Sequence, residues 1–207
     1  MPDASNDRPR LGERIVIVGN TNAGKSTLGA RLAEHLDVLH IELDALFWRP
    51  GWTEPPREEF RARVTEAVQA PHWVMSGSYF DAQADISWPL ATQVLWLDIG
   101  LATVLPRILS RSWTRWRRKE LLWGTNHERF WPQLRVWSDD SLIGYAIKRG
   151  GEKRRRLETR MADPQWSHID FVRLRGTRAI DAWVEEALRA SAGAHEAESE
   201  DPSWRSA

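Results

Sequence analysis

The sequence predicts an α/β domain with a mainly parallel sheet of five strands and helices on both faces. Short runs of apolar, often β-branched residues alternate along the chain with segments in which apolar residues recur every three or four positions. This is the pattern of strands alternating with helices. A glycine-rich stretch follows the first apolar run, and polar residues follow the others. In such a sheet, ligands bind beyond the carboxyl ends of the strands, so these polar residues are the first candidates for a site.

The elements are assigned from apolar spacing and from the turn residues between the runs. The five predicted strands are residues 14–18, 38–43, 73–75, 93–97 and 169–174. Three helices are predicted from their apolar faces, at residues 26–35, 57–69 and 177–189. In the second of them Phe60, Val64 and Val68 are spaced by four, which places them on one face.

The chain is expected to form one domain over residues 14–190. With 207 residues, 42% of them hydrophobic and 28% charged, it is long enough for one core and one insertion. Residues 1–13 are expected to be a flexible leader, and the polar, acidic residues 191–207 a disordered tail. Residues 101–160 are basic and are predicted to form a mostly helical region that includes a lid.

The composition also predicts where the protein works. No apolar run approaches the ~18 residues of a membrane span, and the first residues lack the apolar stretch of a secretory signal. There is no cysteine, which excludes disulfides, thiolate metal sites and cysteine nucleophiles. We therefore expect a cytoplasmic protein without a membrane partner.

The most specific motif is the segment GNTNAGKS, which matches the phosphate-binding pattern G-x-x-x-x-G-K-[ST] without deviation. A predicted strand precedes it and a predicted helix follows it. Glycines let such a loop wrap a phosphate, whose charge is held by backbone N–H groups and the helix N-terminus. The alternative is a glycine turn that only caps a helix. The residues predicted to bind the nucleotide are Gly19, Asn20, Thr21, Asn22, Ala23, Gly24, Lys25, Ser26 and Thr27.

This loop predicts a nucleoside triphosphate, ATP with Mg²⁺, as the ligand. Lys25 is expected to reach the β- and γ-phosphates, and the Ser26 hydroxyl is expected to ligate magnesium. A second magnesium contact is predicted at Asp98, which closes the apolar run 94–97 as in a Walker B segment. The alternative for Asp98 is an ordinary turn or N-cap aspartate.

Two carboxylates, Glu42 and Asp44, are predicted at the end of the second strand. Residues two apart on a strand point to the same face, so both side chains are expected to enter the crevice together. One can meet a magnesium-bound water and the other can orient an acceptor hydroxyl, and the sequence does not say which does which. The alternative is a solvated strand end.

The charge of the chain is zero overall but is unevenly distributed. Residues 107–160 contain 15 Lys and Arg and 6 Asp and Glu, so this segment favours an anionic partner. Arg107, Arg111, Arg115 and Arg118 are spaced four, four and three, which places them on one helical face. Guanidinium groups can stabilise charge during phosphoryl transfer, and Arg107 and Arg111 are the candidates. A solvated helix face is the alternative, as it is for the second cluster at residues 148–156.

Several short segments together resemble a group of adenylate-kinase-like P-loop ATPases, whose members are known as DNA topology modulation proteins or adenylate kinases. The resemblance covers about residues 14–190. The P-loop is specific to the superfamily, whereas Asp-x-Leu-Phe-Trp and Pro-Gly-Trp point to the group. In the third-strand motif, many members have Asp and Asn where this chain has Ser76 and Ser78. The matching segments are Gly19–Thr27 and residues 43–48, 50–52, 73–79, 95–98, 107–111, 120–124 and 126–130.

The resemblance implies a nucleoside-monophosphate-kinase-like fold, ATP binding and phosphoryl transfer, with an arginine lid after the fourth strand. The pair Glu42-x-Asp44 also resembles the paired acids of shikimate-kinase-like enzymes, which phosphorylate a hydroxyl. Combined with the motifs, it predicts a phosphotransferase that uses Lys25, Asp44, Arg107 and Arg111. The expected acceptor is a nucleoside monophosphate or a small hydroxyl metabolite.

Two other functions fit the sequence. The basic middle segment and the names used in the group also suit a regulatory or nucleic-acid-associated ATPase, whose duplex affinity would depend on salt. A nucleotide-binding module without turnover is the third reading, against which the intact Asp44 and Asp98 speak. The oligomeric state is left open.

Overall fold

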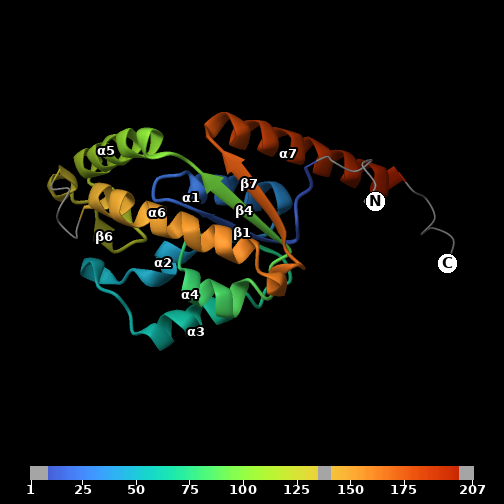
Figure 1. The fold of residues 1–207 in the computed structure, drawn as a ribbon, viewed down its shortest axis with the longest axis horizontal. Coiled ribbons are helices and arrows are strands. Elements are labelled where there is room, and N and C mark those ends of the chain that lie inside the picture. Colours follow the sequence, from blue (N-terminus) through green and yellow to red (C-terminus); the bar gives the residue numbers. More distant parts are fainter. Residues whose placement is uncertain (1–8, 135–140, 201–207) are drawn as a thin grey trace.

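The fold is a three-layer α/β arrangement around a five-stranded parallel sheet (Figure 1). The computed structural model describes residues 9–134 and 141–200. The strand order is β2-β3-β1-β4-β7, and each neighbouring pair is parallel. The five strands are β1 (Arg14–Gly19), β2 (Leu39–Glu42), β3 (Trp73–Ser76), β4 (Gln93–Asp98) and β7 (Asp170–Arg175).

Helices follow the strands in the predicted alternation. Within the described residues the α-helices are α1 (Lys25–Leu36), α2 (Leu43–Phe47), α3 (Arg57–Ala67), α4 (Phe80–Ala82), α5 (Leu101–Arg118), α6 (Leu142–Met161) and α7 (Thr177–Glu200). Short helical turns are η1 (Pro50–Trp52), η2 (Gln83–Ser87), η3 (Trp131–Leu134) and η4 (Pro164–Trp166). A small antiparallel hairpin, β5 (Leu121–Leu122) and β6 (Asn126–His127), connects α5 to η3.

The sheet is buried on both faces, which confirms the prediction from continuous apolar runs. Ile15 and Ile17 belong to the core that includes residues of α1, α5 and α7. Val16 and Val18, their alternate neighbours on β1, belong to the core that includes residues of α3 and α4. The two helical layers therefore hold the strands so that all carboxyl ends open at one edge.

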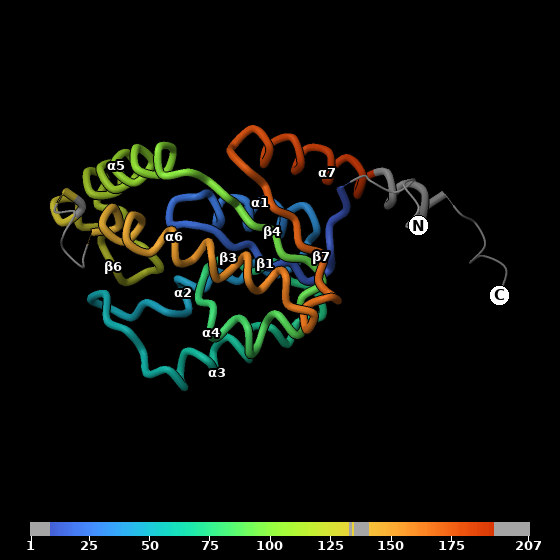
Figure 2. The backbone as a smooth tube through the Cα atoms, in the orientation of Figure 1, coloured from blue at the N-terminus to red at the C-terminus, as the bar shows by residue number. Residues whose placement is uncertain are grey.

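That edge is covered by the segment between the fourth and fifth strands. Helices α5 and α6 contact each other, and they lie with the β5–β6 hairpin at one end of the molecule (Figure 2). Gly150 allows α6 to approach the loop after β1, because a Cβ at this position would lie 3.1 Å from Asn20 Nδ2. The segment predicted to be a lid thus lies next to the phosphate loop.

Two expectations from the sequence differ from the structure. Strand β2 ends at Glu42, so Asp44 lies in the first turn of α2 and not on the strand. Leu43 enters the core at this turn, and an acidic residue is favourable in a first helical turn. Helix α7 continues to Glu200, into the segment expected to be disordered from residue 191, because its alanines favour helix. Residues 1–8 and 201–207 of the expected leader and tail lie outside the described residues.

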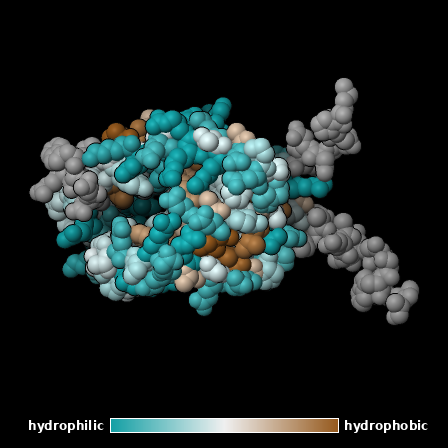
Figure 3. Space-filling model, turned by 60° about the horizontal axis from the view of Figure 1, so that its bottom comes forward, coloured by the Kyte–Doolittle hydropathy of each residue, from teal (hydrophilic) through white to brown (hydrophobic). Residues whose placement is uncertain are grey.

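Helix length and surface hydropathy were compared with what a membrane span requires. No helix within residues 9–134 and 141–200 is both long and apolar enough to cross a bilayer. In the space-filling view most of the visible surface is hydrophilic, and apolar residues gather only in small patches (Figure 3).

Candidate active site

The predicted phosphate loop connects β1 to α1 and has the backbone that its glycines were expected to provide. Gly24 has φ 98° and is the N-cap of α1, a left-handed conformation that glycine adopts without strain. Gly19 has φ 152°, and a Cβ there would lie 2.7 Å from the backbone oxygen of Leu97. Glycine at these two positions therefore lets the loop turn tightly against β4 and open toward solvent at the helix N-terminus.

Lys25 is directed across this loop. Its Nζ donates a hydrogen bond to the backbone oxygen of Asn20 at 2.8 Å, an acceptor that a bound phosphate could replace. Burial lowers the pKa of Lys25 from 10.5 to about 8, and the nearby carboxylate of Asp44 opposes this shift. Lys153 of α6 behaves alike, because burial lowers its pKa to about 8 against the attraction of Asp44.

These pKa values predict the pH dependence of ATP binding. A triphosphate binds the protonated lysines, so affinity should be constant below about pH 8 and fall above it by up to roughly tenfold per pH unit for each lysine. Binding at about pH 8.5 should take up protons, since the phosphates raise both pKa values. Calorimetry in two buffers of different ionisation enthalpy measures this uptake. Lys153→Met should reduce it, and equal heats in the two buffers would contradict the prediction.

Glu42 contacts the first turn of α1 through Ser26. Ser26 Oγ donates a hydrogen bond to Glu42 Oε1 at 2.5 Å, and the indole Nε1 of Trp123 donates to Glu42 Oε2 at 3.1 Å. Glu42 therefore joins the phosphate loop to the loop between β5 and β6. Glu42 and Asp44 therefore have different surroundings, because Asp44 lies in α2 and is hydrogen-bonded to Tyr79 instead.

Asp44 is held by Tyr79, which follows β3. The phenol donates a hydrogen bond to Asp44 Oδ1 at 2.7 Å. Burial raises the pKa of Tyr79, and the negative charge of Asp44 raises it further, so the phenol keeps its proton. Asp44 also lines a cavity.

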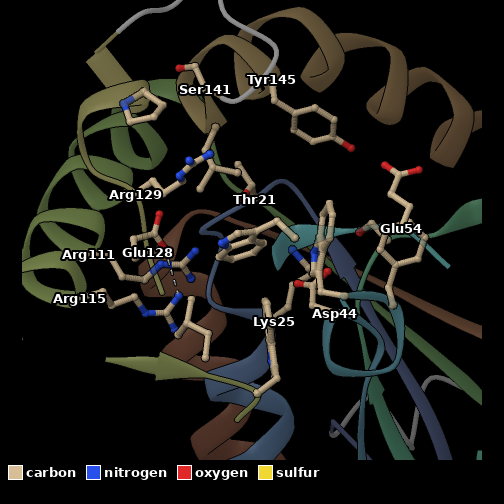
Figure 4. Close-up of a pocket in the computed structure, with 18 of the residues that line it drawn as sticks. Thr21, Lys25, Asp44, Glu54, Arg111, Arg115, Glu128, Arg129, Ser141 and Tyr145 are labelled. Atoms are coloured by element: carbon tan, nitrogen blue, oxygen red, sulfur yellow. Dashed lines mark ion pairs between the residues drawn. The ribbon is translucent and has the colours of Figure 1, made fainter. Parts of the chain in front are cut away.

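A cavity of about 500 Å³ lies over Lys25 and Asp44 (Figure 4). Aromatic residues of α2, η1 and the β5–β6 hairpin form part of its wall, and charged residues of α5 and α6 form another part. Thr21 of the phosphate loop also lines it. The volume suits one small molecule together with the end of a triphosphate.

Of the predicted arginines, the structure brings only some into this cavity. Arg111 and Arg115 line it, and Arg115 Nη1 lies 3.9 Å from Glu128 Oε2. Desolvation lowers the pKa of Arg111, and the charge of Arg115 lowers it further. Arg107, one turn earlier on α5, instead donates a hydrogen bond from Nη2 to Thr177 Oγ1 at 2.9 Å. Its catalytic role stays a prediction without a contact in the cavity to support it.

Asp98 also lies elsewhere. Its Oδ2 accepts two hydrogen bonds from Arg173, at 2.9 Å from Nε and 2.7 Å from Nη2, and Arg154 approaches it at 3.3 Å. It lines a second cavity of about 200 Å³, together with Gly19 and with residues of α5 and α6. The magnesium role of Asp98 stays a prediction, and its carboxylate is shared by arginines in the structure.

This arrangement predicts that Asp98 stabilises the fold. Asp98→Asn should lower the free energy of unfolding by about 1–3 kcal/mol, because a hydrogen-bonded charge pair between β4 and β7 is lost. Denaturant unfolding of Asp98→Asn, Arg173→Met and the double variant gives the coupling energy. Magnesium titrations of ATP binding by wild type and Asp98→Asn test the predicted metal role separately. A shifted titration would support that role, and titrations that overlay would leave Asp98 with a structural role alone.

Several cavity residues were not singled out from the sequence. Tyr79, Glu54, Tyr145 and Lys153 all line the cavity, and Lys153 lines the second cavity as well. For the basic cluster of residues 148–156, the sequence left open both a role toward an anionic partner and a solvated face. The available signal was helical spacing, since Leu142, Tyr145 and Lys153 share one face of α6.

The chain is similar to a few known proteins. No family model matches the chain. The chain is 26% identical over 130 residues to the uncharacterized protein YqaC of Bacillus subtilis (strain 168), covering 57% of this chain and 67% of that protein. A gluconokinase from Sinorhizobium meliloti 1021 superimposes with a TM-score of 0.48 at 17% identity, over 93% of this chain and 99% of that one. A shikimate kinase from Bacteroides thetaiotaomicron gives 0.45 at 20% identity, over 86% and 97%.

The predicted α/β fold is confirmed by the structure itself, which has a five-stranded parallel sheet with helices on both faces and a glycine loop between β1 and α1.

Proposed function

We propose that the protein is an ATP-dependent phosphotransferase that moves the γ-phosphoryl group to a hydroxyl of a small molecule. The observation that supports this most is that Lys25 of the phosphate loop and Asp44 line one cavity. A module that only binds nucleotide has no need for a carboxylate there. The resemblance to adenylate-kinase-like P-loop proteins also implies phosphoryl transfer from ATP.

The residues beside the loop fit a magnesium ion. Ser26 and Glu42 offer a hydroxyl and a carboxylate at hydrogen-bond distance from each other, which is a hard oxygen donor set. No group of three His, Asp or Glu side chains converges on a metal position within the described residues. This is compatible with Mg²⁺, which usually takes one or two protein ligands, phosphate oxygens and water. When bound, the ion would neutralise charge on the phosphates.

The chain's own residues have separate tasks in this proposal. The loop N–H groups and Lys25 hold the phosphates, and Arg111 stabilises the charge that develops on the transferred group. Asp44, fixed by Tyr79, accepts a hydrogen bond from the acceptor hydroxyl and orients it toward the γ-phosphorus. The hydroxyl oxygen forms the new P–O bond as the bond to ADP breaks, and its proton leaves toward Asp44.

We propose that the end of α5, the β5–β6 hairpin and the start of α6 act as a lid over this reaction. Water would otherwise compete for the activated phosphate. Trp123 of the hairpin donates a hydrogen bond to Glu42, which would tie the lid to the proposed magnesium site. Trp123 also lines the cavity.

The test of the function is an acceptor screen. ADP release is measured with Mg-ATP and a panel of nucleoside monophosphates, sugars, hydroxy acids and amino alcohols, and the phosphorylated product is identified by mass. Lys25→Ala should abolish release while circular dichroism and thermal unfolding remain unchanged. ATP binding without transfer to any member would favour the module without turnover.

The Trp123 contact gives a separate prediction. Trp123→Phe keeps the ring but removes the donor that orients Glu42, so half-saturation by magnesium should rise about 10–100-fold, as for other residues that orient a ligand. Trp116→Phe, on the exposed side of α5, is the matched control and should titrate like wild type. Identical magnesium curves for all three proteins would mean that Trp123 only packs.

The nucleic-acid alternative retains one supporting observation. Trp113, Trp116, Phe130 and Trp131 form an aromatic cluster in which the three tryptophans are exposed, with Arg117 beside them in the sequence. Exposed aromatics among arginines can stack on unpaired bases. Binding of a labelled single strand at several salt concentrations tests it, with a Trp113→Ala and Trp116→Ala double variant as the comparison.

A further inference from the structure

The cavity over Lys25 is divided by charge. Figure 4 shows Arg111, Arg115 and Arg129 gathered on the side of α5, with Glu128 between them. Glu54 and Asp44 lie on the opposite side. A ligand that fills the cavity therefore meets three arginines and Glu128 at one end, and Asp44 and Glu54 together with the lysines near Asp44 at the other.

The negative charge of a bound Mg-ATP would balance the surplus positive charge of the cavity. Among the described residues that line the cavity, five carry positive and three carry negative charge, a surplus of two. Mg-ATP brings about two net negative charges to the phosphate loop, which neutralises this surplus. An anionic acceptor would then add negative charge beside Glu54 and Asp44 to a cavity whose charges already balance. The electrostatics of the filled cavity thus favour an acceptor without negative charge.

The acidic end has an aromatic corner. Trp48 and Trp52 meet edge to face with centroids 5.5 Å apart, and Trp52 and Trp123 meet likewise at 5.8 Å. Trp52 has φ 61° and Trp123 φ 47°, left-handed conformations that are unfavourable for a bulky residue and occur at ligand sites. Indole walls at such angles, next to a carboxylate, are suited to a cation and its carbon frame.

The corner is fixed by the neighbouring hairpin. Asn126 accepts a hydrogen bond from the backbone N–H of Trp52 at 2.9 Å and donates one to the backbone oxygen of Arg49 at 3.0 Å. The indole Nε1 of Trp52 donates to the backbone oxygen of His127 at 3.0 Å. These bonds offset the strained backbone of Trp52 and keep the aromatic walls in place before any acceptor binds.

Glu54 is the carboxylate of this end that forms no ion pair within residues 9–134 and 141–200, whereas Asp44 interacts with both Lys25 and Lys153. Its backbone is constrained by the bridge between Arg49 and Thr53 before it and by two prolines after it. Glu54 is exposed to solvent and lines the cavity, so its carboxylate is open to a ligand.

We infer that the phosphoryl acceptor is a small hydroxyl compound that also carries a protonated amine, such as an amino alcohol or an amino sugar. Its ammonium group pairs with Glu54 and contacts the corner formed by Trp48, Trp52 and Trp123, and its hydroxyl reaches Asp44. The products are ADP, the phosphate ester formed at the hydroxyl of the amino compound, and a proton. This inference rests on the proposed phosphotransferase function and narrows its acceptor.

The test uses compounds that share a carbon frame and differ in charge. Glucosamine is compared with N-acetylglucosamine, glucose and gluconate, and ethanolamine with N-acetylethanolamine and glycolate. Binding is measured by thermal shift in the presence of Mg-ADP, and transfer by ADP release with Mg-ATP. We expect the amine of at least one set to bind and react, and its acetylated and anionic counterparts to lose at least about tenfold in kcat/KM, the loss of a charge-assisted hydrogen bond.

A variant assigns the effect to Glu54. Glu54→Gln keeps the shape of the side chain and should lower kcat/KM and binding for the amine at least about tenfold. ATP affinity should remain unchanged. Glu58→Gln, an exposed acid in the first turn of α3, is the matched control and should behave as wild type.

The outcomes separate this inference from the proposed function. Transfer to a neutral or anionic counterpart as fast as to the amine would overturn the inference and leave the phosphotransferase intact. Absence of a thermal shift with either amine at millimolar concentration would overturn it as well, even without any turnover. Amine binding that is lost in Glu54→Gln but gives no phosphoester would support the site and reject the transfer reaction.

Discussion

Arg111→Ala is expected to lower kcat by about 10³–10⁵-fold, the usual cost of removing a cation that stabilises a phosphoryl group in flight. Arg111 lines the cavity beside Arg115, and the mutual repulsion of the two side chains contributes to the lowered pKa of Arg111. In the described part of the chain no carboxylate forms an ion pair with Arg111. A cation kept in a cavity without a paired anion is suited to phosphate. Single-turnover rates of phosphoester formation measure the effect.

The control for Arg111 is on the same helix. Arg118 is exposed and does not line the cavity, so Arg118→Ala should retain wild-type turnover. ATP affinity of Arg111→Ala should stay within a few-fold of wild type, since Lys25 and the loop still hold the phosphates. If Arg111→Ala keeps full turnover and instead loses affinity for nucleic acid, the basic face belongs to a nucleic-acid surface and the lid hypothesis is rejected.

Asp44→Asn should reduce kcat by about 10²–10⁴-fold, the range found for groups that accept or position a reacting proton. The substitution keeps the size of the side chain and its hydrogen bond from Tyr79, and it removes the charge next to Lys25 and Lys153. Turnover should therefore fall while ATP affinity changes little. Pre-steady-state measurements with an identified acceptor separate the chemical step from product release.

Two further variants locate the effect of Asp44. Tyr79→Phe removes only the donor that orients Asp44 and should cost less than Asp44→Asn. Asp181→Asn, on the exposed side of α7, should have no effect. A loss of magnesium affinity in Asp44→Asn, without a change in kcat at saturating metal, would move Asp44 to the metal shell beside Glu42.

The sequence by itself determined the phosphate loop and the sheet. The pattern GNTNAGKS has one backbone solution between a strand and a helix, because Gly24 must adopt a positive φ and Gly19 must lie against β4. Apolar runs without alternation predict strands that are buried on both faces of the sheet. β1 and β4 have this burial pattern. These are local properties, in which neighbours in the chain supply most of the constraint.

The roles of the other charged residues depended on the tertiary structure. Glu42 and Asp44 were predicted as equivalent neighbours on a strand, and the turn into α2 gave them different partners, Ser26 and Tyr79. Arg107 and Arg111 share a helical face, yet α5 is long enough that one meets Thr177 and the other the cavity. The spacing of residues on one helix cannot say what lies opposite each turn.

Long-range packing also decided which parts of the basic segment face the phosphate loop. Lys153 belongs to a run of four cationic residues that looks like a solvated surface in the sequence. It enters the site because α6 crosses the carboxyl edge of the sheet, and glycines in α6 let the helix approach the phosphate loop. Glu54 and Trp123 meet at one cavity although 69 positions separate them in the sequence. A charge or an aromatic ring acquires its role from the groups that burial brings next to it, and that environment is a property of the folded chain.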